Sequence, residues 1–213
     1  MLKLNKTRSI ALLGMFAAII FLMTFTGVGI IPLPFVRPTT LHIPVIIGAL
    51  LLGPKYGAAL GFIFGLASMM FATFNPGPTS FVFSPFIQMP GTESGSASAL
   101  LVAFVPRILV GVIPWYVYIG LRKLTKDKFN LAALAITGVA GSLTNTLLVM
   151  HLIFLLFGES WNAARATPAD AIYAAILGII AVNGIPEAIA SGVLVAAVMG
   201  VLSVVTRQSK ALA

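Results

Sequence analysis

Six apolar segments, separated by polar or proline-rich breaks, restrict what this 213-residue chain can fold into. They cover residues 10–30, 41–52, 57–74, 100–121, 131–157 and 171–205. A bilayer core about 30 Å thick requires about 20 residues of α-helix, and every segment except the second approaches or exceeds that length. Only 8% of the residues are charged, against about 25% in soluble domains. We therefore predict an all-α integral membrane protein, a single domain over residues 1–213 with six transmembrane helices.

Two of these segments differ in length from a straight crossing. Residues 41–52 give a helix of roughly 18 Å, which crosses only where the bilayer is thin or where protein shelters the helix ends. Counting it as a crossing keeps the basic breaks on one side of the membrane. Residues 171–205 are too many for one straight crossing, and Pro186 is expected to kink this helix because proline removes a donor and clashes with the preceding turn.

Positive charges are concentrated in alternate breaks. Ten of the 13 lysines and arginines lie there. They are Lys3, Lys6, Arg8, Lys55, Arg122, Lys123, Lys126, Lys128, Arg207 and Lys210. The opposite breaks hold Arg37 and Arg165. Short loops rich in Lys and Arg stay in the cytoplasm, so both termini are predicted to be cytoplasmic. The basic residues form no stripe with interleaved aromatics, which argues against nucleic-acid binding.

Motifs for common catalytic centres are absent from the sequence. There is no G-x-x-x-x-G-K-[ST] phosphate loop, no H-E-x-x-H, no G-x-S-x-G and no cysteine. We expect no enzyme activity, no cofactor and no metal centre, so that energy from ATP would have to come through a partner. His42 and His151, at the outer ends of two segments, lack further metal ligands and are expected to make interfacial hydrogen bonds.

Polar side chains inside the apolar segments define a candidate ligand site. They are Arg107, Asn145 with Thr144 and Thr146, and Asn183 with Glu187. These groups either line an outward-opening pocket, or Arg107 pairs with Glu187 while the asparagines bond between helices. The planar guanidinium of Arg107 suits a carboxylate, which it can bind through two hydrogen bonds. The pocket would then take a small, polar anion.

The long outer break at residues 75–99 is expected to cover this site. Its first half contains Phe81, Phe83 and Phe86, and its second half is rich in Gly and Ser. Disordered connectors are poor in aromatic residues, so we predict an ordered lid followed by a mobile tail.

Small residues at every fourth position mark close helix contacts. They are Gly57, Gly61 and Gly65 in the third segment, and Gly184, Ala188, Gly192, Ala196 and Gly200 in the sixth. Such rows let helices approach closely in lipid. The spacing does not distinguish packing within the bundle from packing against another subunit, and packing within the bundle is the default expectation. Gly14 and Ala18 form a shorter pair in the first segment.

Five motifs in order resemble the substrate-binding (S) components of energy-coupling factor (ECF) vitamin transporters. They are ALLGMFAA at 11–18, LHIPVIIGALLLGPKYG at 41–57, PRILVG at 106–111, GSLTNT at 141–146 and NGIPE at 183–187. Gly14 takes the first Ala position of the family's Ala-x-x-x-Ala motif. The resemblance covers nearly the whole chain and is greatest to the pantothenate type.

The resemblance implies an S-component fold in a prokaryotic plasma membrane, with pantothenate or another small vitamin as ligand. It places the site at the first and third loops and the outer parts of the last three helices, which adds Thr39, His42 and Phe83 to the candidate ligand-binding residues. It also implies that Gly14 and Ala18 dock a membrane scaffold (T) subunit coupled to two cytosolic ATPases. The alternative is a stand-alone transporter with Glu187 as its proton site.

Overall fold

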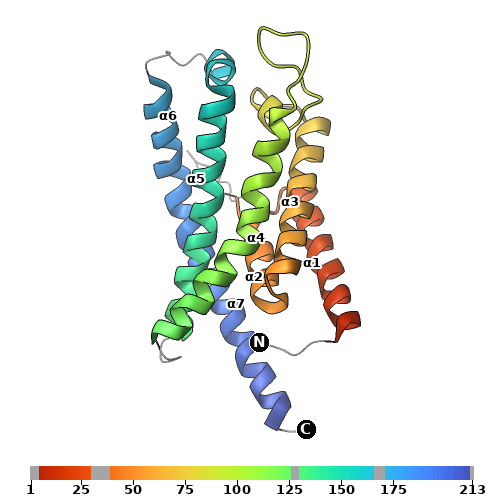
Figure 1. Cartoon of the computed structure of the whole chain (residues 1–213), viewed down its shortest axis with the longest axis vertical. Helices are drawn as coiled ribbons and strands as arrows, with labels where there is room; N and C mark the ends of the chain where they lie inside the picture. Colours follow the sequence, from red (N-terminus) through yellow and green to blue (C-terminus); the bar gives the residue numbers. More distant parts are fainter. Residues whose placement is uncertain (1–4, 30–38, 126–129, 166–170, 212–213) are drawn as a thin grey trace.

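The computed structural model describes residues 5–29, 39–125, 130–165 and 171–211, and this part of the chain is almost entirely helical (Figure 1). The elements are α1 (Lys6–Thr26), α2 (His42–Leu52), α3 (Pro54–Phe74), the 3-10 turn η1 (Ser80–Val82), α4 (Ser98–Thr125), α5 (Asn130–Arg165), α6 (Ile172–Ile179), the π-helical turn η3 (Ile180–Gly184) and α7 (Ile185–Ala211). The structure confirms the predicted all-α fold.

Each predicted segment corresponds to helix. Helices α1, α3, α4 and α5 and the continuous run Ile172–Ser203 are long and apolar enough to cross a bilayer. The main differences lie at the ends, since α4 continues to Thr125 and α5 to Arg165, beyond the apolar parts of their sequences. Polar residues at the end of a long helix can extend past the hydrocarbon layer, so apolar length alone underestimates these helices.

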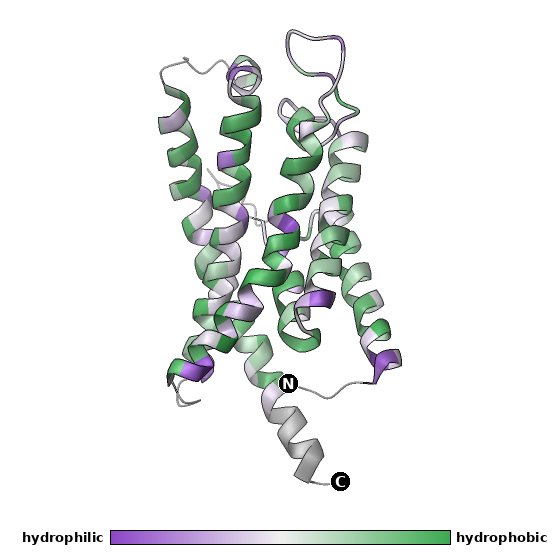
Figure 2. Ribbon diagram, viewed as in Figure 1, coloured by the Kyte–Doolittle hydropathy of each residue, from purple (hydrophilic) through white to green (hydrophobic). Residues whose placement is uncertain are grey.

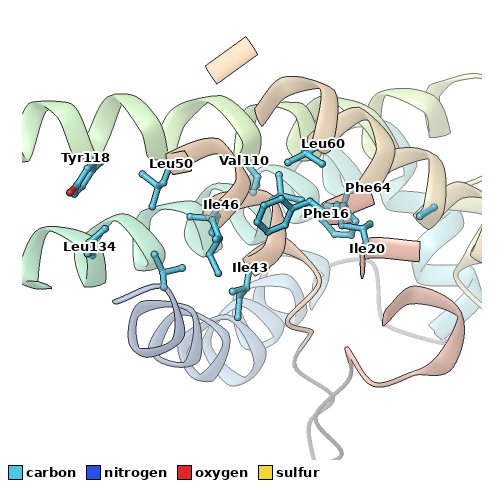
Figure 3. Packing of buried hydrophobic residues seen from close by; sticks show 14 of the residues in the cluster. Phe16, Ile20, Ile43, Ile46, Leu50, Leu60, Phe64, Val110, Tyr118 and Leu134 are labelled. Atoms are coloured by element: carbon cyan, nitrogen blue, oxygen red, sulfur yellow. The ribbon is translucent and has the colours of Figure 1, made fainter. Parts of the chain in front are cut away.

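Helix α2, too short to cross a bilayer by length alone, lies inside the bundle. Every residue from His42 to Leu50 is buried. Ile43, Ile46 and Leu50 of α2 pack in one core cluster with side chains from five other helices, as the close-up in Figure 3 shows in part. Because protein surrounds α2, its 11 residues need not match the bilayer thickness.

The lid predicted at residues 75–99 packs against the bundle through its first half. Phe81 and Val82 are 2% and 1% exposed, and the Phe81 ring meets the Phe157 ring of α5 edge to face, with centroids 5.9 Å apart. The hydroxyls of Ser84 and Thr73 are 2.7 Å apart, which ties this half to α3. The loop projects from the end of the bundle opposite the start of α1 (Figure 1).

The expected irregularity before Pro186 is a π-helical turn. Residues Ile180–Gly184 form η3, which connects α6 to α7 without a break in the helical run. Pro186 cannot donate a hydrogen bond to the carbonyl of Val182, so the ordinary α-helical ladder fails at this point. π-helical turns of this kind are frequent at functional sites.

Most of the basic residues in the described helices lie at one end of the bundle, with Arg107 and Arg165 as exceptions. Three helix ends that carry basic residues lie on the side of the bundle where α7 terminates (Figures 1 and 2). They are the start of α1 with Lys6 and Arg8, the start of α3 with Lys55, and the end of α4 with Arg122 and Lys123. The structure thus brings the beginning of α1 and the end of α7 to the same side. That this side is cytoplasmic stays a prediction from the charge bias.

Both rows of small residues pack within the bundle, as predicted. A Cβ atom on Gly57 or Gly61 would collide with the α4 backbone at Gly111 or Arg107. A Cβ atom on Gly192 would lie 3.2 Å from the carbonyl oxygen of Ala135 in α5. Helix α4 therefore lies directly against α3, and α7 lies directly against α5.

We expect Gly61→Ala to destabilise the protein, because the added methyl group would force α3 away from α4 at Arg107. Overpacking of this kind costs about 1–3 kcal/mol. The matched control is Gly120→Ala in α4, since a Cβ atom there meets nothing within 4 Å. Thermal unfolding of the detergent-solubilised variants measures the effect, and equal midpoints for both variants would contradict this packing.

Candidate functional site

A cavity of about 390 Å³ lies among α1, α3, α4, α5 and α7, with lid residues on its wall. Small-molecule pockets generally have volumes of roughly 300–1,000 Å³. Seven of the predicted site residues line it: Thr39, Phe83, Arg107, Asn145, Thr146, Asn183 and Glu187. The structure therefore brings together side chains from five separate parts of the sequence around one space.

Arg107 is held by a carbonyl group that its neighbouring proline leaves free. Pro106 has no N–H, so the carbonyl of Val102 lacks its usual donor within α4. The Nη1 atom of Arg107 donates a 2.8 Å hydrogen bond to that oxygen. The Pro-Arg pair thus satisfies an orphan acceptor of the helix and fixes one edge of the guanidinium.

Aromatic rings enclose the same guanidinium. Its Cζ atom lies 5.4 Å from the centroid of Phe64 in α3 and 5.1 Å from the centroid of Phe83 in the lid. These distances are within the range of cation–π attraction. Arg107 is 7% exposed, and its Nε atom is buried without a hydrogen-bond partner. Arg107 thus lines the cavity with a charged side chain that has an unpaired N–H group.

Glu187 is engaged by other groups than Arg107. Its Oε1 atom accepts hydrogen bonds from the backbone N–H of Thr39 at 2.6 Å and from the Thr39 hydroxyl at 3.3 Å. Its Oε2 atom accepts a 3.2 Å bond from the hydroxyl of Thr146. Among the described residues no ion pair joins it to Arg107, so the sequence alternative in which these two charges pair is not the arrangement found.

Asn145 supplies a second unpartnered group. It is 8% exposed, and its Oδ1 atom is buried without a hydrogen-bond partner. Helix α7 comes close to this part of α5, since a Cβ atom on Gly184 would lie 3.1 Å from Cγ2 of Thr146. Unpaired buried acceptors are unfavourable, so this amide is a strong candidate for a ligand's N–H or O–H.

Thr144 and His42 do not line the cavity. The Thr144 hydroxyl donates to the Ala140 carbonyl of its own helix at 2.7 Å. Adjacent helical residues point in different directions, and here Asn145 and Thr146 face the cavity. His42 is 0% exposed, and neither ring nitrogen has a partner among the described residues. The expected interfacial hydrogen bond of His42 is therefore wrong, because α2 begins inside the bundle. His151 bonds the carbonyl of Leu147 at 2.7 Å.

Sequence reasoning missed several lining residues. Phe64 and Ser68 lie four residues apart on α3, and Thr24 contributes from α1. Ser68 and Thr24 are polar residues inside apolar segments, so the criterion that selected Asn145 could have selected them too. Phe64 gave no such signal, because phenylalanine is an ordinary core residue.

The apolar bundle with this internal cavity is that of a multi-pass protein of the cell membrane. Residues 8–199 match the family model described as "ECF transporter, substrate-specific component". The match spans most of the sequence, and the chain belongs to this family.

Two relatives have names that state a substrate. The chain is 39% identical over 206 residues to "Pantothenic acid transporter PanT" of Lactococcus lactis subsp. cremoris, covering 95% of this chain and 97% of that protein. It is 32% identical over 206 residues to "Pantothenate transporter PanT" of Leuconostoc mesenteroides subsp. mesenteroides, covering 93% of each. The similarity extends through all the helices that build the cavity.

Asn145→Leu replaces an amide whose oxygen has no partner with an apolar side chain of similar size. The ligand-free protein would no longer bury an unpaired acceptor, so we expect its unfolding free energy to stay equal or rise by about 1 kcal/mol. Thermal unfolding in detergent tests this. The control is Ser191→Ala, which removes a satisfied 2.9 Å bond to the Gly138 carbonyl and should lower stability. A midpoint below wild type for Asn145→Leu would contradict this interpretation.

Proposed function

We propose that this chain is the pantothenate-binding S component of an ATP-driven ECF importer. The observation that carries the proposal is Arg107, which lines the cavity and has a buried Nε donor without a hydrogen-bond partner among the described residues. A guanidinium in this state is suited to bind a carboxylate. The names of the two relatives support pantothenate as the ligand that carries it.

The groups on the cavity wall complement pantothenate. This vitamin has one carboxylate, one amide and two hydroxyls. Arg107 would bind the carboxylate. Asn145, Asn183 and Thr39 would form hydrogen bonds with the amide and the hydroxyls. Phe83 would cover the apolar part of the ligand from the lid, as pockets of this kind combine apolar walls with a few placed polar groups.

The family relationship supports an assembly with a T subunit and two cytosolic ATPases. This chain has no phosphate loop of its own, so the proposed import requires a partner that hydrolyses ATP. Gly14 and Ala18 of α1 would form the docking surface. Both are exposed, and a Cβ atom on Gly14 would meet nothing within 4 Å. A small, open surface of this kind allows another helix to approach closely.

Arg107→Ala is expected to weaken pantothenate binding strongly, because the carboxylate would lose a buried, charge-assisted partner. Losses of this kind are about 2–5 kcal/mol, or at least about 30-fold in Kd. Arg107→Lys keeps the charge but lacks the planar guanidinium, so its affinity for pantothenate should lie between those of the wild type and Arg107→Ala. Isothermal titration calorimetry with the purified chain measures all three.

The control is Arg122→Ala, which removes an arginine near the opposite end of α4. It should bind pantothenate like the wild type. Unchanged affinity in Arg107→Ala would refute the carboxylate contact, and a wild-type chain that binds a different vitamin, or none, would refute the assignment of pantothenate.

Gly14→Leu is expected to prevent docking to the T subunit while leaving pantothenate binding by the isolated chain intact. The bulky side chain would fill the open surface of α1, which does not contribute to the cavity at this position. Co-purification with the co-expressed T subunit and ATPases measures docking, and radiolabelled uptake measures transport. Gly120→Leu on α4 is the control, and a Gly14→Leu variant that co-purifies and transports normally would disprove the assignment.

A further inference from the structure

The segment that precedes α2 is held at two neighbouring residues. The N–H of Thr40 donates to the carbonyl of Gly29 at 2.8 Å, and the Thr40 hydroxyl bonds the same oxygen at 3.2 Å. Thr39, one residue earlier, is bonded instead to Glu187 of α7. Thr39 and Leu41 both line the cavity. The placement of this short segment therefore sets part of the cavity wall.

We propose that Glu187 is a positioning residue that fixes this wall through Thr39, and that its effect on the ligand is transmitted through that contact. Its carboxylate connects three separate elements: the segment before α2 at Thr39, helix α5 at Thr146, and its own helix α7. The ligand part of this inference rests on the proposed function.

The hydrogen-bond inventory of Glu187 supports this role. An ionised carboxylate accepts about four hydrogen bonds, and three of these positions are filled by protein donors. The shortest bond, 2.6 Å, comes from the backbone N–H of Thr39, whose position does not depend on the rotamer of the Thr39 side chain. Hydrogen bonds to a charged acceptor are about twice as strong as neutral ones. Little acceptor capacity is left for the ligand.

The charges of the site favour the same conclusion. A ligand that brings a carboxylate to Arg107 would be repelled by a second carboxylate that contacted it directly. Donors from Thr39 and Thr146 compensate the negative charge of Glu187, which is 7% exposed. In this arrangement Arg107 can bind the anion, while Glu187 holds Thr39 on the cavity wall.

Two conservative variants separate position from charge. Glu187→Gln keeps the length of the side chain and an acceptor for the Thr39 N–H, but removes the charge. Glu187→Asp keeps the charge but is too short to bond Thr39 and Thr146 together. If Glu187 acts by position, Glu187→Gln should hold Thr39 in place better than Glu187→Asp. A direct electrostatic role would give the opposite order.

The first measurement is hydrogen exchange of the Thr39 amide in the ligand-free, full-length protein, followed by mass spectrometry. Glu187→Ala and Glu187→Asp should raise its exchange rate by about 10- to 100-fold, the size expected when a hydrogen bond to a charged group is lost. Glu187→Gln should raise it by less than about tenfold. Thr144→Val, which alters a hydroxyl outside the cavity, is the control and should leave it unchanged.

The second measurement is the dissociation rate of radiolabelled pantothenate from the same variants. It should increase in the order wild type, Gln, Asp and Ala, in parallel with the exchange of Thr39. Unchanged exchange in both Asp and Ala variants would overturn the proposal, as would an Asp variant that releases pantothenate more slowly than the Gln variant. If the wild type itself bound no pantothenate, the proposed function would fail, and the exchange measurement would still decide the role of Glu187.

Discussion

The structure depends on how an apolar helix bundle accommodates the guanidinium of Arg107. A charged group inside a membrane protein requires local partners, since lipid offers none. Pro106 provides one by leaving the carbonyl of Val102 without its helical donor, and Arg107 bonds that oxygen. Rings of Phe64 and Phe83 lie against the guanidinium. These contacts stabilise the cation without neutralising it, which keeps a donor available to a ligand.

The two hydrophobic clusters of the bundle have different relations to the cavity. The first surrounds α2 and includes Phe64, and the second joins the lid residues Phe81 and Val82 to α5, including Val149. Phe64 and Val149 both line the cavity, which therefore borders the two clusters. The first cluster lies among helices that meet closely at the small residues. The second joins the lid to α5 and so places the lid over the same cavity.

Much of this architecture could be predicted from the sequence because its causes are local. Apolar length located the helices, and the four-residue spacing of Gly57 and Gly61 predicted a close helix contact, although it could not name α4 as the partner that the structure shows. The depth of Arg107 and Asn145 within their segments indicated the cavity. The rotation of each helix about its own axis was harder to predict. Thr144 and Asn145 are adjacent in sequence, but of these two only Asn145 lines the cavity. His42 was misjudged because the burial of α2 depends on its neighbours rather than on its own residues.

The separation of Arg107 from Glu187 is the feature that sequence reasoning was least able to decide. Opposite charges at similar depth favour an ion pair, and that pair would have left no strong donor for an anion. The outcome depends on Thr39 and Thr146, which come from a loop and a different helix and occupy the carboxylate. Thr39 and Thr146 bond Glu187, and the Val102 carbonyl bonds Arg107, so the two side chains line one cavity without pairing with each other. This separation leaves Arg107 without a carboxylate partner from the described residues, as the proposed binding of a ligand carboxylate requires.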